Sequence, residues 1–186
     1  MQPGRTLQLT PAQRRWFALE QVLVPTLFNL AFNAALGWAT FRAATPVPLF
    51  ARPSIWTDLL RPSIGGDILG MLFFLPGFTC LIATPLIKRA ARLGKVQRLS
   101  IAPEQHWLLR RMPRGLWSRS GFIGLACVLL FGPVSIGLLA LLGLDAWSLS
   151  AAVWFKGLYA GLLAAMVSPL IALYALSLHE SEPAPA

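Results

Sequence analysis

The chain has 186 residues, of which 56% are hydrophobic and only 12% are charged. This composition excludes an ordinary soluble domain, because a soluble chain of this length cannot bury so much apolar surface. The net charge of +9 lies mostly between apolar segments, so we expect the cations to bind anionic lipid headgroups and not nucleic acid.

The first apolar segment covers residues 16–41 and carries one charge, Glu20. An α-helix needs about 20 residues to cross the hydrocarbon core of a bilayer, so this segment is long enough to span a membrane. A cleaved signal peptide is the alternative interpretation, because two arginines precede the segment as cations precede the apolar part of a signal peptide. The segment is too long for such a part and contains Asn29 and Asn33, so we expect a retained transmembrane helix.

The second apolar segment, residues 68–87, contains no charge. It follows an outer loop of residues 42–67, which we expect to be extended because its four prolines restrict the backbone. The third segment covers residues 120–144 without a charge, and the fourth covers residues 150–178 with one charge, Lys156. None of the four segments has the polar face that a helix of a soluble bundle needs.

Residues 88–119 form a basic loop that contains nine Lys or Arg and one acid, Glu104. An excess of Lys and Arg in short loops marks the cytoplasmic side of a membrane protein. The sequence therefore predicts an all-α integral protein of the inner membrane. Its single domain is a bundle of four transmembrane helices, with the N-terminus and a tail of residues 179–186 both in the cytoplasm.

The later part of the basic loop, residues 107–117, mixes aromatic and apolar side chains with arginines. Such a mixture is typical of a segment at the membrane interface, where rings lie at headgroup level beside cations. We therefore expect anionic lipids to bind at the basic loop. An ordinary solvated connector is the alternative.

Each of the four apolar segments contains an internal proline, which removes a backbone hydrogen bond and tends to bend a helix. We predict hinges at Pro25, Pro85, Pro133 and Pro169. Prolines are also tolerated in membrane helices that do not move, which is the alternative interpretation.

Residues 73–87 align with residues 157–171, with identical residues at four of fifteen positions. The identities include a Pro-Leu-Ile ending and a glycine eight residues before the proline. This similarity predicts a 2+2 tandem repeat with both halves in the same orientation, as in transporters built from parallel repeats. A chance match between two apolar segments is the alternative.

Polar and small residues share one side of the first apolar helix, within an arc of about 80°. They are Thr26, Asn29, Asn33, Gly37 and Thr40. Two interpretations remain open, because such a face lines a hydrated pathway in some proteins and forms hydrogen bonds to neighbouring helices in others.

Charged groups inside an apolar segment are costly and therefore invite a functional hypothesis. Glu20 is a candidate proton or cation site, or else a boundary carboxylate that pairs with Lys88 or Arg89. Lys156 and Asp67 both lie toward the outer side, so we expect an ion pair between their helices. A Lys156 side chain that faces an outer vestibule and attracts anions is the alternative.

Small residues recur along one side of the fourth helix, where they allow another helix backbone to approach closely. This small-residue stripe contains Gly157, Gly161, Ala164 and Ser168. The helix that it contacts belongs either to this chain or to a second copy.

Motifs of the common enzyme classes do not occur in the sequence, which has no HExxH, no GxSxG and no phosphate-binding glycine loop. His106 and His179 lie in unrelated segments. Cys80 and Cys127 both fall inside apolar segments, where a thiol behaves as a small apolar group. We therefore expect no enzymatic activity, no cofactor and no metal site.

These observations favour a permease-like protein that moves a small solute or ion. Its pathway candidates are Glu20, Thr26, Asn29, Asn33, Asp67 and Lys156. Four helices enclose little space, so a homodimer is expected. The alternative is an accessory or scaffold subunit that docks a larger membrane partner through the small-residue stripe of the fourth helix.

Overall fold

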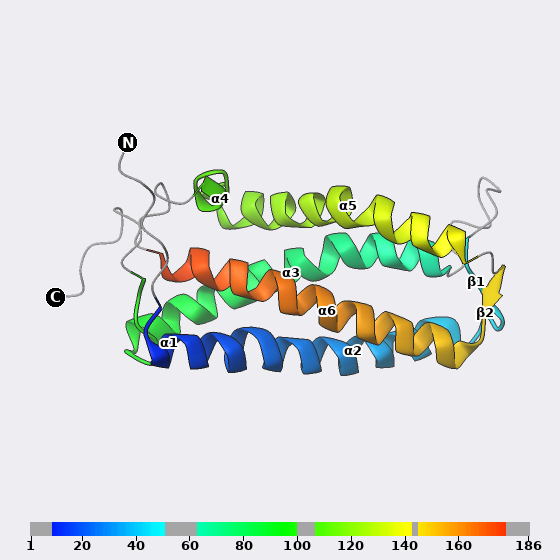
Figure 1. The fold of residues 1–186 in the computed structure, drawn as a ribbon, viewed down its shortest axis with the longest axis horizontal. Helices are drawn as coiled ribbons and strands as arrows, with labels where there is room; N and C mark the ends of the chain where they lie inside the picture. The colour runs from blue at the N-terminus through cyan, green and yellow to red at the C-terminus, as the bar shows by residue number, and fades with distance from the viewer. Residues whose placement is uncertain (1–8, 51–62, 100–106, 143–144, 178–186) are drawn as a thin grey trace.

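The structure is a computed structural model that describes residues 9–50, 63–99, 107–142 and 145–177. Four helices in it are long and apolar enough to cross a membrane, which confirms the prediction of an all-α chain with four such helices (Figure 1). The tail 179–186, Glu104, both histidines and residues 51–62 of the outer loop lie outside the described residues.

The first long helix is continuous from Pro11 to Phe41 and consists of three parts. These are α1 (Pro11–Trp16), the π-helical segment η1 (Phe17–Leu23) and α2 (Val24–Phe41). It begins earlier than the apolar segment because the Thr10 hydroxyl accepts from the Gln13 N–H while the Gln13 side chain accepts from the Thr10 N–H. This reciprocal cap satisfies two donors that a helix start otherwise leaves unpaired.

The π-helical segment lies directly before Pro25. Proline has no N–H to donate, and its ring clashes with the carbonyl four residues earlier in an α-helix. The chain accommodates this clash by widening the preceding turn, where the N–H of Val24 donates to the Leu19 carbonyl five residues back.

Along the whole first helix, the buried positions recur at intervals of four residues. The fully buried residues are Gln13, Phe17, Gln21, Asn33, Gly37 and Phe41. The intermediate members of the same series, Pro25 and Asn29, are half-buried. One continuous face of this helix therefore points into the protein.

The remaining helices are α3 (Ile64–Arg92), the short α4 (Trp107–Arg110), α5 (Leu116–Leu141) and α6 (Leu149–Leu176). Helix α3 extends beyond the apolar segment 68–87 at both ends, so Asp67 and Lys88 are helical. Its start is fixed by Ser63, whose hydroxyl accepts from the Gly66 N–H at 3.2 Å, and Ser148 caps α6 in the same way.

The long helices are arranged in the order α2, α6, α3, α5, so that α6 and α3 each contact two neighbours (Figure 1). Helices α3 and α6 run in the same direction and cross each other. Their interface with α5 contains a buried apolar cluster that includes Leu72, Cys80, Cys127, Val167 and Ile171. The outer sides expose large apolar side chains, such as Phe28 on α2 and Leu130 on α5.

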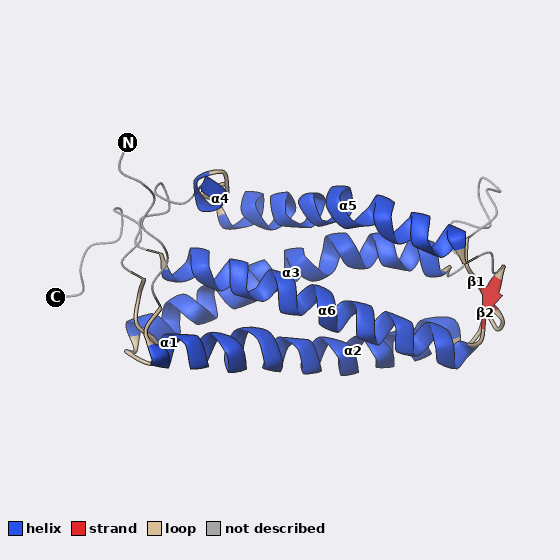
Figure 2. Ribbon diagram, viewed as in Figure 1, coloured by secondary structure: helices blue, strands red, loops and turns tan. Residues whose placement is uncertain are grey.

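Backbone hydrogen bonds connect segments far apart in the sequence at both ends of the helical array, and we call each such connection a tie. At one end, which we call the strand end, β1 (Val47–Pro48) pairs antiparallel with β2 (Ala146–Trp147) (Figure 2). At the other, which we call the α1 end, the Leu99 N–H donates to the Leu176 carbonyl at 2.9 Å. The first tie joins the α2–α3 connection to the α5–α6 connection.

Glycines allow very close backbone contacts at two helix interfaces. Where α6 meets α2, a Cβ on Gly157 would lie 2.9 Å from the Leu30 carbonyl oxygen, and one on Gly161 would lie 3.1 Å from the Thr26 carbonyl oxygen. Where α5 meets α3, a Cβ on Gly124 would lie 2.6 Å from a carbonyl oxygen. Neither interface has room for a larger residue at these positions.

We expect Gly124→Ala to destabilise the protein by about 1–3 kcal/mol, because the added methyl group forces the backbones of α5 and α3 apart. The measurement is reversible unfolding in mixed micelles, followed by circular dichroism. Gly137→Ala is the matched control on the same helix, because a Cβ there meets nothing within 4 Å. Equal stability of the two variants would show that the close contact is not needed.

Candidate functional site between helices α2, α3 and α6

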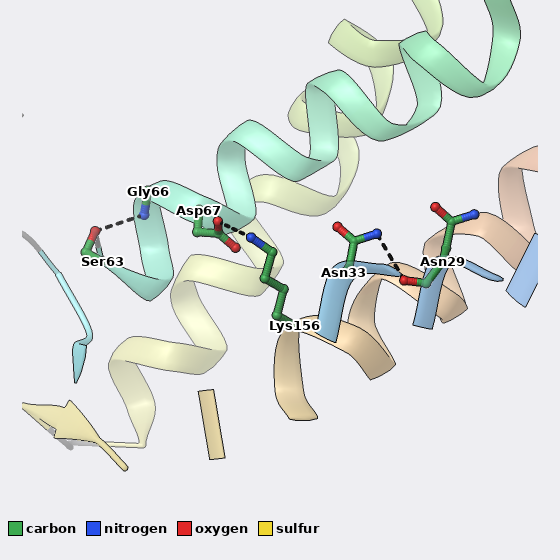
Figure 3. Close-up of polar contacts among 6 residues, drawn as sticks. All are labelled: Asn29, Asn33, Ser63, Gly66, Asp67 and Lys156. Atoms are coloured by element: carbon green, nitrogen blue, oxygen red, sulfur yellow. Dashed lines mark hydrogen bonds and ion pairs between the residues drawn. The ribbon is translucent and has the colours of Figure 1, made fainter. Parts of the chain in front are cut away.

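A buried ion pair joins α6 to α3 near the strand end (Figure 3). The Lys156 Nζ lies 2.5 Å from the Asp67 Oδ1, and the two side chains are only 9% and 19% exposed. The ammonium also lies 5.6 Å from the centroid of the Phe41 ring on α2, within the range of a cation–π interaction. Three helices therefore contribute to the surroundings of one cation.

Local structure positions both members of this pair. Asp67 lies in the first turn of α3, where the positive end of the helix dipole stabilises a carboxylate. The Ser63 cap fixes that turn, and the Asp67 N–H donates to the Ser63 carbonyl. On α2, Gly37 leaves space for the lysine stem, because a Cβ there would lie 3.1 Å from the Lys156 Cδ.

The polar face of α2 adjoins this pair but makes its hydrogen bonds within its own helix. Asn33 is buried, and its Nδ2 donates to the Asn29 carbonyl at 3.0 Å (Figure 3). Asn29 donates to the Pro25 carbonyl at 2.9 Å, and the Thr26 hydroxyl donates to the Val22 carbonyl at 2.6 Å. Within the described part of the chain, these three side chains form no hydrogen bond to α3 or α6.

The amide oxygens of Asn29 and Asn33 are therefore left as acceptors, because only their nitrogens donate to the helix backbone. Thr40, the last member of the face, is exposed. The polar face of α2 is thus buried in its middle, at Asn33 near Lys156. It is partly accessible on one side, at Thr26 and Asn29, and exposed on the other, at Thr40.

Glu20 lies apart from this site, on the exposed side of η1. No ion pair joins it to Lys88 or Arg89 among the residues that the structure describes. At a rise of about 1.5 Å per residue, Glu20 is roughly 25 Å along the helix from Gly37. The structure therefore brings Lys156, Asp67 and Asn33 together but does not bring Glu20 to them.

The small-residue stripe of α6 lies against α2 of the same chain. Gly157 and Gly161 contact the α2 backbone, while Ala164 and Ser168 are almost completely buried. Gly157 directly follows Lys156, so the close contact that brings α6 to α2 also fixes the position of the cation.

The prolines named as hinges have different surroundings. Pro25 is the second residue of α2, just after the π-helical segment, whereas the other three lie inside helices that continue through them. Those three are Pro85, Pro133 and Pro169.

Sequence reasoning treated Arg119 as one of nine loop cations, but the structure buries it. Its side chain lies in the first turns of α5, and the residue is only 4% exposed. Its position directly before a long charge-free segment was the only signal in the sequence. The two free cysteines are also buried, and no group of metal-binding side chains occurs in the described ranges.

Comparison with known proteins finds no match: no protein family matches the chain, and no curated protein or solved structure is significantly similar to it. A function must therefore be inferred from the residues of the site.

We expect Lys156→Met to destabilise the protein by about 3–5 kcal/mol, because it leaves the Asp67 carboxylate buried without its partner. Replacing both residues, as in Asp67→Leu with Lys156→Met, should restore most of the lost stability. A double-mutant cycle of unfolding free energies measures this coupling. Lys95→Met, which removes an exposed lysine, is the control and should be close to neutral. Purely additive single effects would contradict a coupled pair.

Proposed function

We propose that the protein is a small permease-like protein of the inner membrane that moves a small solute or ion. The buried pair of Lys156 and Asp67 carries this proposal. Ionisable groups are expensive inside a membrane, and where they occur they usually belong to a substrate or ion pathway. A pair that served only to join helices could be replaced by apolar side chains at little cost.

We further propose that the four long helices span the membrane with the α1 end in the cytoplasm. The cations that follow α3 support this orientation, because Lys and Arg in short loops accumulate on the cytoplasmic side. Of the two connections at the strand end, the one between α5 and α6 contains Asp145 and no cation, and the one between α2 and α3 contains three arginines and Asp58. The ion pair then lies toward the outer leaflet.

Matching contacts support a 2+2 tandem repeat. In the alignment of residues 73–87 with 157–171, Gly77 corresponds to Gly161 and Phe73 to Gly157. Gly77 and Phe73 contact α5 at Ser120 and Gly124, while Gly161 and Gly157 contact α2 at Thr26 and Leu30. The partner positions are four residues apart in both helices, as a tandem repeat would require.

In this proposal the substrate pathway lies between α2, α3 and α6, and the intact ion pair closes its outer end. Breaking the pair frees the Lys156 ammonium and the Asp67 carboxylate to bind a substrate group of opposite charge. The amide oxygen of Asn33, deeper in the same interface, then offers the next acceptor along the route. A second copy of the chain would complete the enclosure.

An accessory or scaffold subunit remains the alternative function. The small-residue stripe of α6 is covered by α2, so a larger partner would need another surface. The exposed side of α5, with Leu129 65% and Leu130 67% exposed, is one apolar candidate, but lipid covers such a surface equally well.

Flux into proteoliposomes tests the transport proposal. The probes are protons, potassium and chloride, together with urea and glycerol as neutral solutes followed by light scattering. We expect the wild type to conduct at least one probe, and Asp67→Asn and Asn33→Leu to reduce that flux at least tenfold, a loss of about 1.4 kcal/mol or more.

Thr40→Leu and Glu20→Gln are the controls for this experiment, because both side chains are exposed and neither forms a hydrogen bond or ion pair with Lys156 or Asp67 in the described part of the chain. Their flux should remain within about twofold of the wild type, equivalent to less than 1 kcal/mol. A wild type that matches empty liposomes for every probe would contradict transport of small ions and solutes. A loss of flux in Glu20→Gln alone would identify Glu20, on η1, as the group that couples transport to ions.

A further inference from the structure

We infer that Arg119 binds a phosphate group at the start of α5, either from a lipid headgroup or free in solution. The lipid source rests on the membrane placement proposed above, but the site does not depend on whether the protein transports anything. The inference comes from a buried cation at the N-terminus of a long helix that has no counter-charge among the described residues.

The Arg119 guanidinium is enclosed but poorly satisfied. Its Cζ lies 4.1 Å above the Tyr174 ring of α6, and its Nη1 donates to the Arg114 carbonyl at a long 3.4 Å. Its Nε is buried and has no hydrogen-bond partner. Tyr174 belongs to a buried cluster with Leu109 and Met112, so the segment after α4 covers this side of α6.

An arginine keeps its charge in proteins, and a buried charge without a partner is strongly unfavourable. The acids among the described residues cannot serve as that partner. Asp67 pairs with Lys156. Asp145 lies at the strand end, where its backbone carbonyl accepts from the Leu49 N–H. Glu20 lies on the exposed side of η1. We therefore expect the charge of Arg119 to be balanced by an anion other than these three carboxylates.

The start of α5 provides further donors for such an anion. Gly115 is the N-cap and has no side chain with which to accept the N–H groups of the first turn. These groups, together with the helix dipole, favour an anion at this end. The Arg119 guanidinium points back to the same place, because it reaches the carbonyl of Arg114, one residue before the cap.

The position of the site along α5 matches the depth of lipid phosphates. Helix α5 has 26 residues, and no charge follows Arg119 within it. At about 1.5 Å per residue the helix exceeds a hydrocarbon core of about 30 Å by roughly two turns, so its first turn lies at headgroup level. Trp117, which is 78% exposed beside it, is the residue type that prefers this level.

A phosphate fits these donors better than a carboxylate would. Its oxygens can accept from the guanidinium and from backbone N–H groups at once, and arginine recognises phosphate by paired hydrogen bonds. Arg110, Arg111 and Arg114 stand on the exposed chain just before the helix and add positive charge along the approach.

Retention of lipid by the purified full-length protein tests this inference. Protein in nanodiscs of phosphatidylcholine with phosphatidylglycerol is transferred to detergent, and bound lipid is counted by native mass spectrometry. We expect one retained phosphatidylglycerol per chain in the wild type and about tenfold weaker retention in Arg119→Gln. Arg92→Gln is the matched control, because it removes an exposed arginine at the end of α3, outside the site, and should retain the lipid.

Thermal unfolding in detergent distinguishes the two sources of phosphate. Inorganic phosphate that raises the unfolding temperature of the wild type, but not of Arg119→Gln, would identify free phosphate as the ligand. An increase with phosphatidylglycerol alone would identify the lipid. Arg119→Lys keeps the charge without the paired donors, so it should fold and bind with intermediate strength.

Two results would overturn the inference. One is equal retention of lipid and an equal response to phosphate in wild type and Arg119→Gln. The other is a Glu104→Gln variant that is as unstable as Arg119→Gln and is not additive with it, because this would make Glu104 the counter-charge. Neither result depends on the flux measurements, so failure here leaves the transport proposal intact.

Discussion

Helix α6 contacts α2 through Gly157 and Gly161, and this close backbone contact determines where the only charge of α6 lies. In the proposed membrane location, lipid gives apolar helices no hydrophobic reason to associate, so close van der Waals contact between backbones supplies the stability. Lys156 directly precedes the first of these glycines, which directs its side chain between α2 and α3 rather than toward the exposed outer side of α6. The ion pair with Asp67 follows from that contact.

The apolar segments were predictable because each exceeds the length needed to cross a bilayer and carries almost no charge. The order in which the helices pack could not be predicted, because a helix that is apolar on every side does not indicate which neighbour it contacts. The small-residue stripe of α6 indicated a contact but not its partner, which proved to be α2. Helix ends depended on caps such as Thr10 and Ser63, which apolar length alone does not locate.

Under the proposed tandem repeat, the two halves of the chain differ in the polar residues of their first helices. If Thr26 corresponds to Ser120, then Asn29 and Asn33 correspond to Ile123 and Cys127 on α5. The polar face therefore exists in only one half, although both halves use the same kind of interface. Arg119 corresponds to Pro25 in the same comparison, so one half has a buried cation where the other has the proline that follows the π-helical segment.

The four-residue spacing of buried positions along the first helix determines the sense in which it winds around its neighbours. The spacing exceeds the 3.6 residues of an α-helical turn, so the buried line drifts around the helix in a right-handed sense. The π-helical segment, with its wider turn, reduces this drift before Pro25. Helices wound in this way cross at an angle instead of lying parallel, so they are closest at one point and diverge on either side of it. In this protein the backbones of α2 and α6 come close together at the pair of glycines on α6.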